Sequence, residues 1–303
     1  MYDITIIGAG IAGMTAAIYA RRANKKVLVL EGKTYGGQIV ETEKIENYPA
    51  APGIAGPELA KKVYDQMMKF NPDFKYEKVL GISKNDDGFK ITTDESEYSS
   101  KTVVIATGTN YKKAGLENEA ELTGRGVSYC ATCDGSLYRD KEIAVFGGGN
   151  SALYSVLYLS DLASKVTVIH RRNEFRGDDA LVKKIKTKEN VDYKLGKVVS
   201  ELKSEDGKLS SIVLKNVKNG ETEELKVAAL FVEIGREPDN SIFKDLVELD
   251  EKGYIKADED GKTSASGFFA AGDCRAKTLR QIVTASSDGA AAASSAIEYL
   301  NSK

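Results

Sequence analysis

The chain has 303 residues, of which 42% are hydrophobic and 29% are charged, and its net charge at pH 7 is −2. This near-neutral balance gives no electrostatic basis for binding nucleic acid or an anionic membrane. No apolar run approaches the roughly 20 residues that span a bilayer, and no basic segment or apolar signal core precedes the first expected strand. We therefore expect a cytoplasmic protein with two domains.

The beginning of the chain reads as a nucleotide-binding unit. Gly8 permits a tight turn, Gly10 lets the backbone approach a pyrophosphate, and Gly13 allows close packing of helix on strand. Glu31, at the end of the next strand, is placed to accept hydrogen bonds from a ribose diol. The expected strand, glycine turn, helix and strand cover, in this order, residues 4–7, 8–13, 14–22 and 26–31.

The same unit recurs in the middle of the chain. Gly8 precedes Glu31 by 31 − 8 = 23 positions, and Gly147 precedes His170 by 170 − 147 = 23, so His170 takes the place of the acid. The arginines that follow bind a 2′-phosphate bidentately, whereas a carboxylate would repel it. The second site is therefore predicted to take NADPH and the first FAD; the alternative for the arginines is a solvated basic turn. The second strand, turn, helix and strand are expected at residues 142–146, 147–152, 153–162 and 165–170.

A close pair of cysteines lies between the two glycine turns. Cys130 and Cys133 can close a small reducible disulfide, and such a pair near a βαβ unit in a cytosolic protein is a redox motif. Asp134 is the nearest candidate to exchange protons, the alternative being a turn-forming aspartate. The remaining cysteine, Cys274, is expected to be a small buried residue. With one histidine, His170, the chain offers too few ligands for a four-ligand zinc site, so no metal is expected.

The later segments complete the expected flavin site. A buried strand at residues 102–105 ends in Ala106-Thr107-Gly108, and a further strand ends at Gly272-Asp273. Asp273 is a candidate to bind the ribityl chain of the flavin. An alanine-rich helix is expected to open at Arg280-Gln281 and to run to about residue 300.

Several motifs together resemble low-molecular-weight thioredoxin reductases. They are GRGVSYCATCDG at 124–135, HRRNEFR at 170–176, AGD at 271–273, LRQIV at 279–283, GGQ at 36–38 and ENYP at 46–49. The resemblance implies an α/β homodimer with two Rossmann-like dinucleotide-binding domains, the second inserted into the first. The FAD domain would comprise residues 1–112 and 243–303, and the NADPH and disulfide domain residues 113–242.

The resemblance also implies a reaction and its residues. Electrons would pass from NADPH to FAD, then to the Cys130–Cys133 disulfide, and then to thioredoxin or a similar protein. Cys133 would face the flavin, Cys130 would attack the partner, and Asp134 would be the general acid. The residues expected at the FAD site are Gly8, Gly10, Ile11, Ala12, Gly13, Glu31, Gly32, Gly37, Gln38, Asn47, Ala106, Thr107, Gly108, Gly272, Asp273, Arg280, Gln281 and Ile282. Those expected at the NADPH site are Gly147, Gly149, Asn150, Ser151, Ala152, His170, Arg171, Arg172 and Arg176.

One departure from the family pattern keeps alternatives open. Where the family carries two acids near the nicotinamide end of the cofactor, this chain has Tyr154-Ser155. Some clostridial relatives take electrons from ferredoxin, so a ferredoxin-dependent reductase is one alternative. A dithiol oxidase of the same fold and a nucleotide-responsive binding protein are the others. Because the disulfide and the nicotinamide must each approach one flavin, the inserted domain is expected to rotate about linkers at 110–114 and 237–241.

Overall fold

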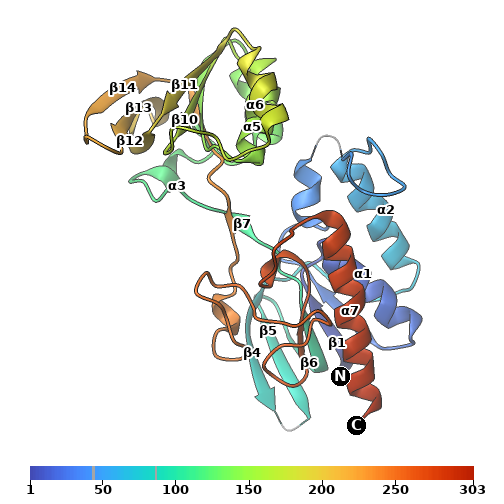
Figure 1. Cartoon of the computed structure of the whole chain (residues 1–303). Helices are drawn as coiled ribbons and strands as arrows, with labels where there is room; N and C mark the ends of the chain where they lie inside the picture. Colours follow the sequence, from blue (N-terminus) through green and yellow to red (C-terminus); the bar gives the residue numbers. More distant parts are fainter. Residues whose placement is uncertain (43–44, 86) are drawn as a thin grey trace. The chain divides into compact units, whose positions relative to one another are not determined.

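The chain crosses twice between two structural units in the computed structural model, which describes residues 1–42, 45–85 and 87–303 (Figure 1). Unit 1 comprises Met1–Asn110 and Glu237–Lys303, and unit 2 comprises Tyr111–Arg236. The sequence-based boundaries, after residue 112 and before residue 243, differ by 112 − 110 = 2 and 243 − 237 = 6 residues. The crossings themselves pair as two short strands, β7 (Asn110–Tyr111) and β16 (Arg236–Glu237).

The sheet of unit 1 is mixed. Its strands lie in the order β3-β2-β1-β6-β5-β4, with β17 also paired to β6. The strands β1, β2, β3, β6 and β17 run parallel, and β4 and β5 extend the sheet antiparallel. Their bounds are β1 Tyr2–Ile7, β2 Val27–Leu30, β3 Asp73–Lys75, β4 Val79–Asn85, β5 Gly88–Thr93, β6 Glu97–Ile105 and β17 Phe268–Ala270.

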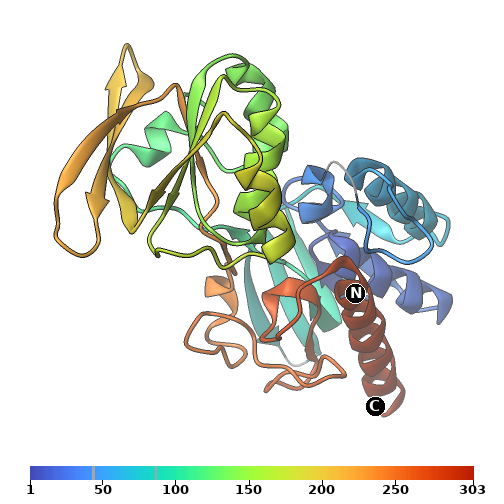
Figure 2. The ribbon, with the colours of Figure 1, turned by 45° about the horizontal axis from the view of Figure 1, so that its top comes forward.

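Two helices of unit 1 run side by side along the sheet (Figures 1 and 2). They are α1 (Ile11–Arg22) and α7 (Ile282–Asn301), and α2 (Gly56–Met68) packs next to α1. Glycine and alanine allow the close approach, because a Cβ on Gly289 would come within 2.1 Å of the carbonyl oxygen of Ala12. Short 3-10 helices lie at Gly37–Glu41, Ser241–Phe243 and Gly272–Cys274.

Unit 2 is built on a second parallel sheet, in the order β11-β10-β9-β15-β8. Helices α5 and α6 cover one face, and the antiparallel strands β12, β13 and β14 pack on the other (Figures 1 and 2). Alternate residues point to opposite faces, so Val145 packs with the helices and Ala144 with the antiparallel strands. The bounds are β8 Val127–Ser128, β9 Glu142–Phe146, β10 Lys165–His170, β11 Val191–Leu195, β12 Lys197–Glu205, β13 Lys208–Asn216, β14 Thr222–Lys226, β15 Ala229–Val232, α3 Glu119–Leu122, α4 Ala131–Asp134, η2 Gly135–Tyr138, α5 Asn150–Ser160 and α6 Asp179–Lys186.

The α/β class, the parallel strands of the mixed sheet in unit 1 and the parallel sheet of unit 2 confirm the fold expected from the sequence. The strands at 142–146 and 165–170 have the predicted bounds, but both helices that follow the glycine turns begin three residues earlier than predicted. The last positions of each turn are already helical, as the α1 residue Gly13 shows. None of the helices within the described residues is both long and apolar enough to cross a membrane.

Candidate functional site

The first glycine turn joins β1 to α1 in unit 1. The Gly8 amide donates to the carbonyl of Leu30 (2.8 Å), and a Cβ on Gly8 would meet the carbonyl oxygen of Ala106 at 2.4 Å. In contrast, a Cβ on Gly10 would meet no atom of the described residues within 4 Å, at the point where α1 begins. The turn thus presents open space in front of a helix N-terminus, which fits a pyrophosphate.

Glu31 is oriented by the same turn. Its carboxylate accepts hydrogen bonds from the amides of Ala9 (2.7 Å) and Lys33 (2.8 Å). Because a carboxylate offers about four acceptor sites, both bonds leave capacity for a ribose diol. Glu31 therefore lies where the sequence places it.

Segments distant in sequence gather around this turn. The side-chain amide of Gln38 donates to Thr109 Oγ1 (2.7 Å), and that of Asn47 donates to Gln281 Oε1 (2.9 Å). A Cβ on Gly37 would lie 3.3 Å from the Cα of Gly10. The remaining expected residues lie at the strand end after β6 (Ala106, Thr107, Gly108), in α1 (Ile11, Ala12, Gly13), after Glu31 (Gly32), in the 3-10 turn (Gly272, Asp273) and at the start of α7 (Arg280, Ile282).

Sequence reasoning missed a buried ion cluster at the start of the 3-10 turn. Asp288 of α7 accepts from the Gly272 amide (3.0 Å), from Arg275 (2.8 Å) and from Lys277 (2.7 Å). Burial raises the pKa of Asp288, but the two cations outweigh it, so that the pKa lies below its usual value. Cys274 is fully buried beside this cluster, and burial raises the pKa of its thiol, which leaves it a packing residue as expected.

The second glycine turn repeats the hydrogen bonds of the first. The Gly147 amide donates to the carbonyl of Ile169 (2.9 Å), as that of Gly8 does to Leu30. A Cβ on Gly149 would meet nothing within 4 Å among the residues that the structure describes, again where a helix begins. Asn150 closes the turn by exchanging two hydrogen bonds with Asp178 (2.8 and 2.9 Å). Ser151 is exposed, and Ala152 is buried in the helix.

Two of the basic residues of the second unit, Arg172 and Arg176, line an open cavity of about 280 Å³, here called the arginine cavity, together with Asn173, Glu174 and Phe175. Arg171, Arg172 and Arg176 are exposed, and His170 is buried below them. Burial and the three guanidinium groups lower the pKa of His170. Its buried Nε2 has no hydrogen-bond partner within residues 1–42, 45–85 and 87–303. An exposed cluster of cations over a neutral imidazole suits a phosphate monoester.

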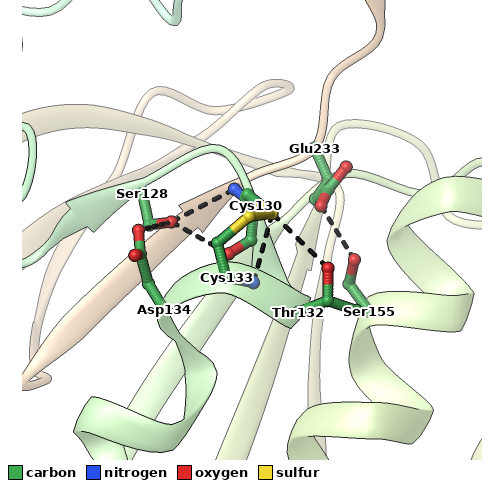
Figure 3. Close-up of a disulfide and its surroundings, with 7 residues drawn as sticks. All are labelled: Ser128, Cys130, Thr132, Cys133, Asp134, Ser155 and Glu233. Carbon is green, nitrogen blue, oxygen red and sulfur yellow. Dashed lines mark hydrogen bonds between the residues drawn. A yellow bond between two sulfur atoms is a disulfide. The ribbon is translucent and has the colours of Figure 1, made fainter. Parts of the chain in front are cut away.

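The Cys130–Cys133 disulfide is formed and lies at the start of α4 (Figure 3). Cys133 is exposed and Cys130 half-buried. The amide of Cys133 donates to Cys130 Sγ (3.2 Å). A hydrogen bond to sulfur favours its anionic form, so this contact would stabilise a Cys130 thiolate after reduction.

Asp134 is connected to this turn through Ser128. The Ser128 hydroxyl donates to Asp134 Oδ2 (2.7 Å) and accepts from the Cys130 amide (3.1 Å), as Figure 3 shows. The sequence motif contained Ser128, but its role became visible only with the turn in place. The expected proton donor is thus fixed within two hydrogen bonds of the Cys130 backbone.

The parallel sheet of unit 2 determines the order in which the arginine cavity, the second glycine turn and the disulfide lie along one of its edges. Strands β10, β9, β15 and β8 are neighbours in that order, and their carboxyl ends meet at one edge. His170 ends β10, Gly147 follows β9, Glu233 follows β15, and Cys130 lies just beyond β8. The arginine cavity, the glycine turn and the disulfide therefore follow one another along the edge where open α/β sheets bind ligands.

A buried carboxylate supports the segment before the disulfide. Glu119 accepts hydrogen bonds from the amides of Ala114 (2.8 Å), Gly115 (2.7 Å) and Leu116 (3.1 Å), and from the Tyr129 hydroxyl (2.6 Å). Burial raises the pKa of Glu119, but these four donors outweigh it and hold the pKa below its ordinary value. Glu119 thus ties the first crossing to the residue that precedes Cys130.

We expect Glu119→Gln to lower the free energy of unfolding by about 1–3 kcal/mol at neutral pH, because the amide cannot satisfy all four donors. A depressed carboxyl pKa stabilises the fold above the unfolded-state value and loses that effect as pH falls through the folded-state value. Urea unfolding from about pH 7 to about pH 3 should therefore show a constant difference between the two proteins above about pH 5 and a shrinking difference below it. Glu117→Gln, at an exposed neighbour, is the control. A difference that stays constant with pH would refute the assignment.

Comparison with known proteins agrees with this geometry. The family model of pyridine nucleotide-disulphide oxidoreductases matches residues 2–289. The thioredoxin reductase of Bacillus subtilis is 42% identical over 300 residues, which cover 99% of this chain and 95% of that protein. The crystal structure of Lactococcus lactis thioredoxin reductase has a TM-score of 0.95 at 40% identity and covers 100% of both chains. A ferredoxin-flavin thioredoxin reductase from Clostridium acetobutylicum is 30% identical, with a TM-score of 0.55, and covers 100% of this chain and 99% of that chain.

The match extends over both units and includes the disulfide, the two glycine turns and the strands that position them. With these features on one continuous alignment, the chain belongs to the pyridine nucleotide-disulphide oxidoreductase family.

Proposed function

We propose that this chain is a thioredoxin-disulfide reductase that takes FAD in unit 1 and NADPH in unit 2. The observation that carries the proposal is the shared sheet edge in unit 2, where a redox disulfide lies two strands away from a nucleotide turn. The family uses FAD and NADPH, and relatives similar over nearly the whole chain are thioredoxin reductases.

The residues of the first turn would hold FAD, with Gly10 facing the pyrophosphate and Glu31 the ribose. When bound, FAD supplies the chemistry that couples hydride transfer to thiol exchange. The Cys130–Cys133 disulfide takes up one electron pair and two protons and becomes two thiols. Asp134, held by Ser128, is the group placed to exchange protons there.

Thiol exchange then regenerates the disulfide. The Cys130 thiolate attacks the disulfide of thioredoxin and forms a mixed disulfide, while one thioredoxin sulfur leaves as a thiolate. Cys133 next attacks the sulfur of Cys130, which restores the Cys130–Cys133 bond and releases thioredoxin as a dithiol. The hydrogen bond from the Cys133 amide supports Cys130 as the attacking thiolate.

The arrangement of groups along the sheet edge of unit 2 also implies that unit 2 rotates between the two half-reactions. The disulfide and the NADPH turn belong to one rigid sheet but must each meet the single flavin, so both cannot do so at once. A lysine-reactive cross-link between the units should preserve either flavin reduction or thioredoxin reduction and stop turnover. Full turnover in cross-linked protein would rule the rotation out.

The arginine cavity supports NADPH as the electron donor rather than ferredoxin. We expect NADPH to bleach the flavin band anaerobically, and reduced ferredoxin not to be required. Arg172→Ala should raise the concentration of NADPH needed for half-maximal bleaching by about 10- to 100-fold, because one charged hydrogen bond contributes about 1.5–3 kcal/mol. The value for NADH, which lacks the 2′-phosphate, should change little. Bleaching by ferredoxin alone would establish the alternative.

A homodimer, which the sequence resemblance implies, and a cytoplasmic location belong to the same proposal. Light scattering on the purified chain tests the first, and fractionation of cells tests the second.

A further inference from the structure

One polar pair at the edge of unit 2 has no part in the chemistry described above. The Ser155 hydroxyl, on α5, donates to Glu233 Oε1 at 2.8 Å, and both side chains are half-buried. Glu233 follows β15, between the glycine turn after β9 and the disulfide beyond β8. Figure 3 shows Ser155 directed at Glu233 in the surroundings of the disulfide.

The internal repeat shows that the fold does not require this pair. The Glu233 amide donates to Phe146 (2.8 Å) as the Ala106 amide donates to Ile7 (2.8 Å). A Cβ on Gly147 would meet the Glu233 carbonyl at 2.2 Å, just as one on Gly8 would meet that of Ala106 at 2.4 Å. Glu233 is therefore the counterpart of Ala106.

Ser155 likewise has an apolar counterpart. It follows Gly147 by 155 − 147 = 8 positions, as Ala16 follows Gly8 by 16 − 8 = 8. Unit 1 builds the same turn with two alanines, of which Ala16 is fully buried. The second repeat has added a hydroxyl and a carboxylate at a place where the first manages without either.

The expected path of a dinucleotide across this sheet edge identifies the part of the ligand that the Glu233 carboxylate would contact. With a 2′-phosphate at the arginine cavity and the pyrophosphate at Gly149, the remaining half continues past β9 to the end of β15, where the strand order reverses. That half of NADPH carries hydrogen-bond donors, namely the ribose hydroxyls and the carboxamide N–H groups. A carboxylate is an acceptor that matches both.

We propose that Glu233 binds the nicotinamide-ribose half of NADPH and that Ser155 positions its carboxylate; this rests on the proposed use of NADPH. The second turn of α5 carries Tyr154-Ser155 in place of acids, and the acidic group reaches the same edge from β15 instead. Glu233 thereby takes the place of the acids that α5 lacks at Tyr154-Ser155, and NADPH use does not require an acid on α5.

Calorimetric titration of the FAD-loaded enzyme with NADP⁺ and with 2′,5′-ADP, which lacks the nicotinamide mononucleotide half, tests this assignment. Glu233→Gln should weaken NADP⁺ binding about tenfold, the loss of one charged hydrogen bond, and leave 2′,5′-ADP binding within about twofold. Ser155→Ala should give a smaller loss for NADP⁺ alone, and Ser155→Thr should restore it. Glu221→Gln removes the same charge at an exposed site of unit 2 and should change neither.

The outcomes separate the two proposals. If Glu233→Gln leaves the ratio of the two affinities unchanged, Glu233 does not bind the nicotinamide half. Equal weakening of both ligands would mean that Glu233 only supports the turn, which also overturns the assignment. If unaltered enzyme fails to bind 2′,5′-ADP at all, the NADPH site itself is refuted, and this role for Glu233 falls with it.

Discussion

Replacing Cys133 with serine is expected to abolish thioredoxin reduction, by roughly 10³-fold or more, while NADPH still bleaches the flavin. The serine hydroxyl cannot form a disulfide, so an electron pair can reach the flavin but cannot be stored on the sulfur pair. Stopped-flow absorbance measures the first half-reaction, and a coupled thioredoxin assay measures turnover. The variant should retain the rate of flavin reduction and lose thioredoxin turnover.

The third cysteine supplies the control. Cys274→Ala removes a buried thiol in unit 1 whose Sγ contacts the backbone carbonyl oxygens of Ile105 (3.4 Å) and Ala271 (3.3 Å). It should retain turnover. If Cys133→Ser reduces thioredoxin at an undiminished rate, the dithiol is not on the electron path.

A second large effect is expected at the first glycine turn, where alanine substitutions of two glycines should lower two different properties. Substitution of Gly13 should lower folding stability, and substitution of Gly10 should lower the affinity for FAD. Gly13→Ala would place a Cβ 1.9 Å from the carbonyl oxygen of Gly8, and backbone on both sides cannot yield, so we expect a loss of about 3 kcal/mol of folding stability. Gly10→Ala meets open space and should fold normally. Its methyl group would nevertheless occupy the path of the pyrophosphate and weaken FAD binding by about 2 kcal/mol, roughly 30-fold.

Urea unfolding and the ratio of flavin to protein absorbance distinguish these effects. Gly81→Ala in β4 is the matched control, because its added Cβ also meets nothing within 4 Å among the described residues. Flavin retention in Gly10→Ala equal to that of the control would show that FAD does not approach this turn.

The parts of the fold that repeat locally could be predicted from the sequence. Short apolar runs predict β9 and β10 with the bounds that the structure has, and the equal spacing of Gly8–Glu31 and Gly147–His170 identifies two equivalent turns. The helices α1 and α5 begin three residues before their predicted starts, because the last three positions of each glycine turn are already helical. In the structure Gly13 is helical, and the absence of a side chain on Gly13 allows its backbone to pack directly against Gly8.

Other features depend on contacts between distant residues, which one sequence does not reveal. Ser155 and Glu233 are 78 positions apart, and nothing in either neighbourhood indicates the other. The carboxylate of Glu119 sits in a four-residue helix whose sequence looks exposed, yet three amides and a tyrosine converge on it. The strands β12, β13 and β14 have weak local patterns and are held by pairing with one another.

The central claim is that the Cys130–Cys133 disulfide exchanges electrons with a flavin bound to the same chain. Anaerobic titration with dithionite, followed at the flavin band, measures this directly because it bypasses NADPH. The unaltered enzyme should consume two electron pairs per chain, one for the flavin and one for the disulfide, and Cys133→Ser only one. Equal consumption by both proteins, or a colourless chain that cannot be reconstituted with FAD, would contradict the account.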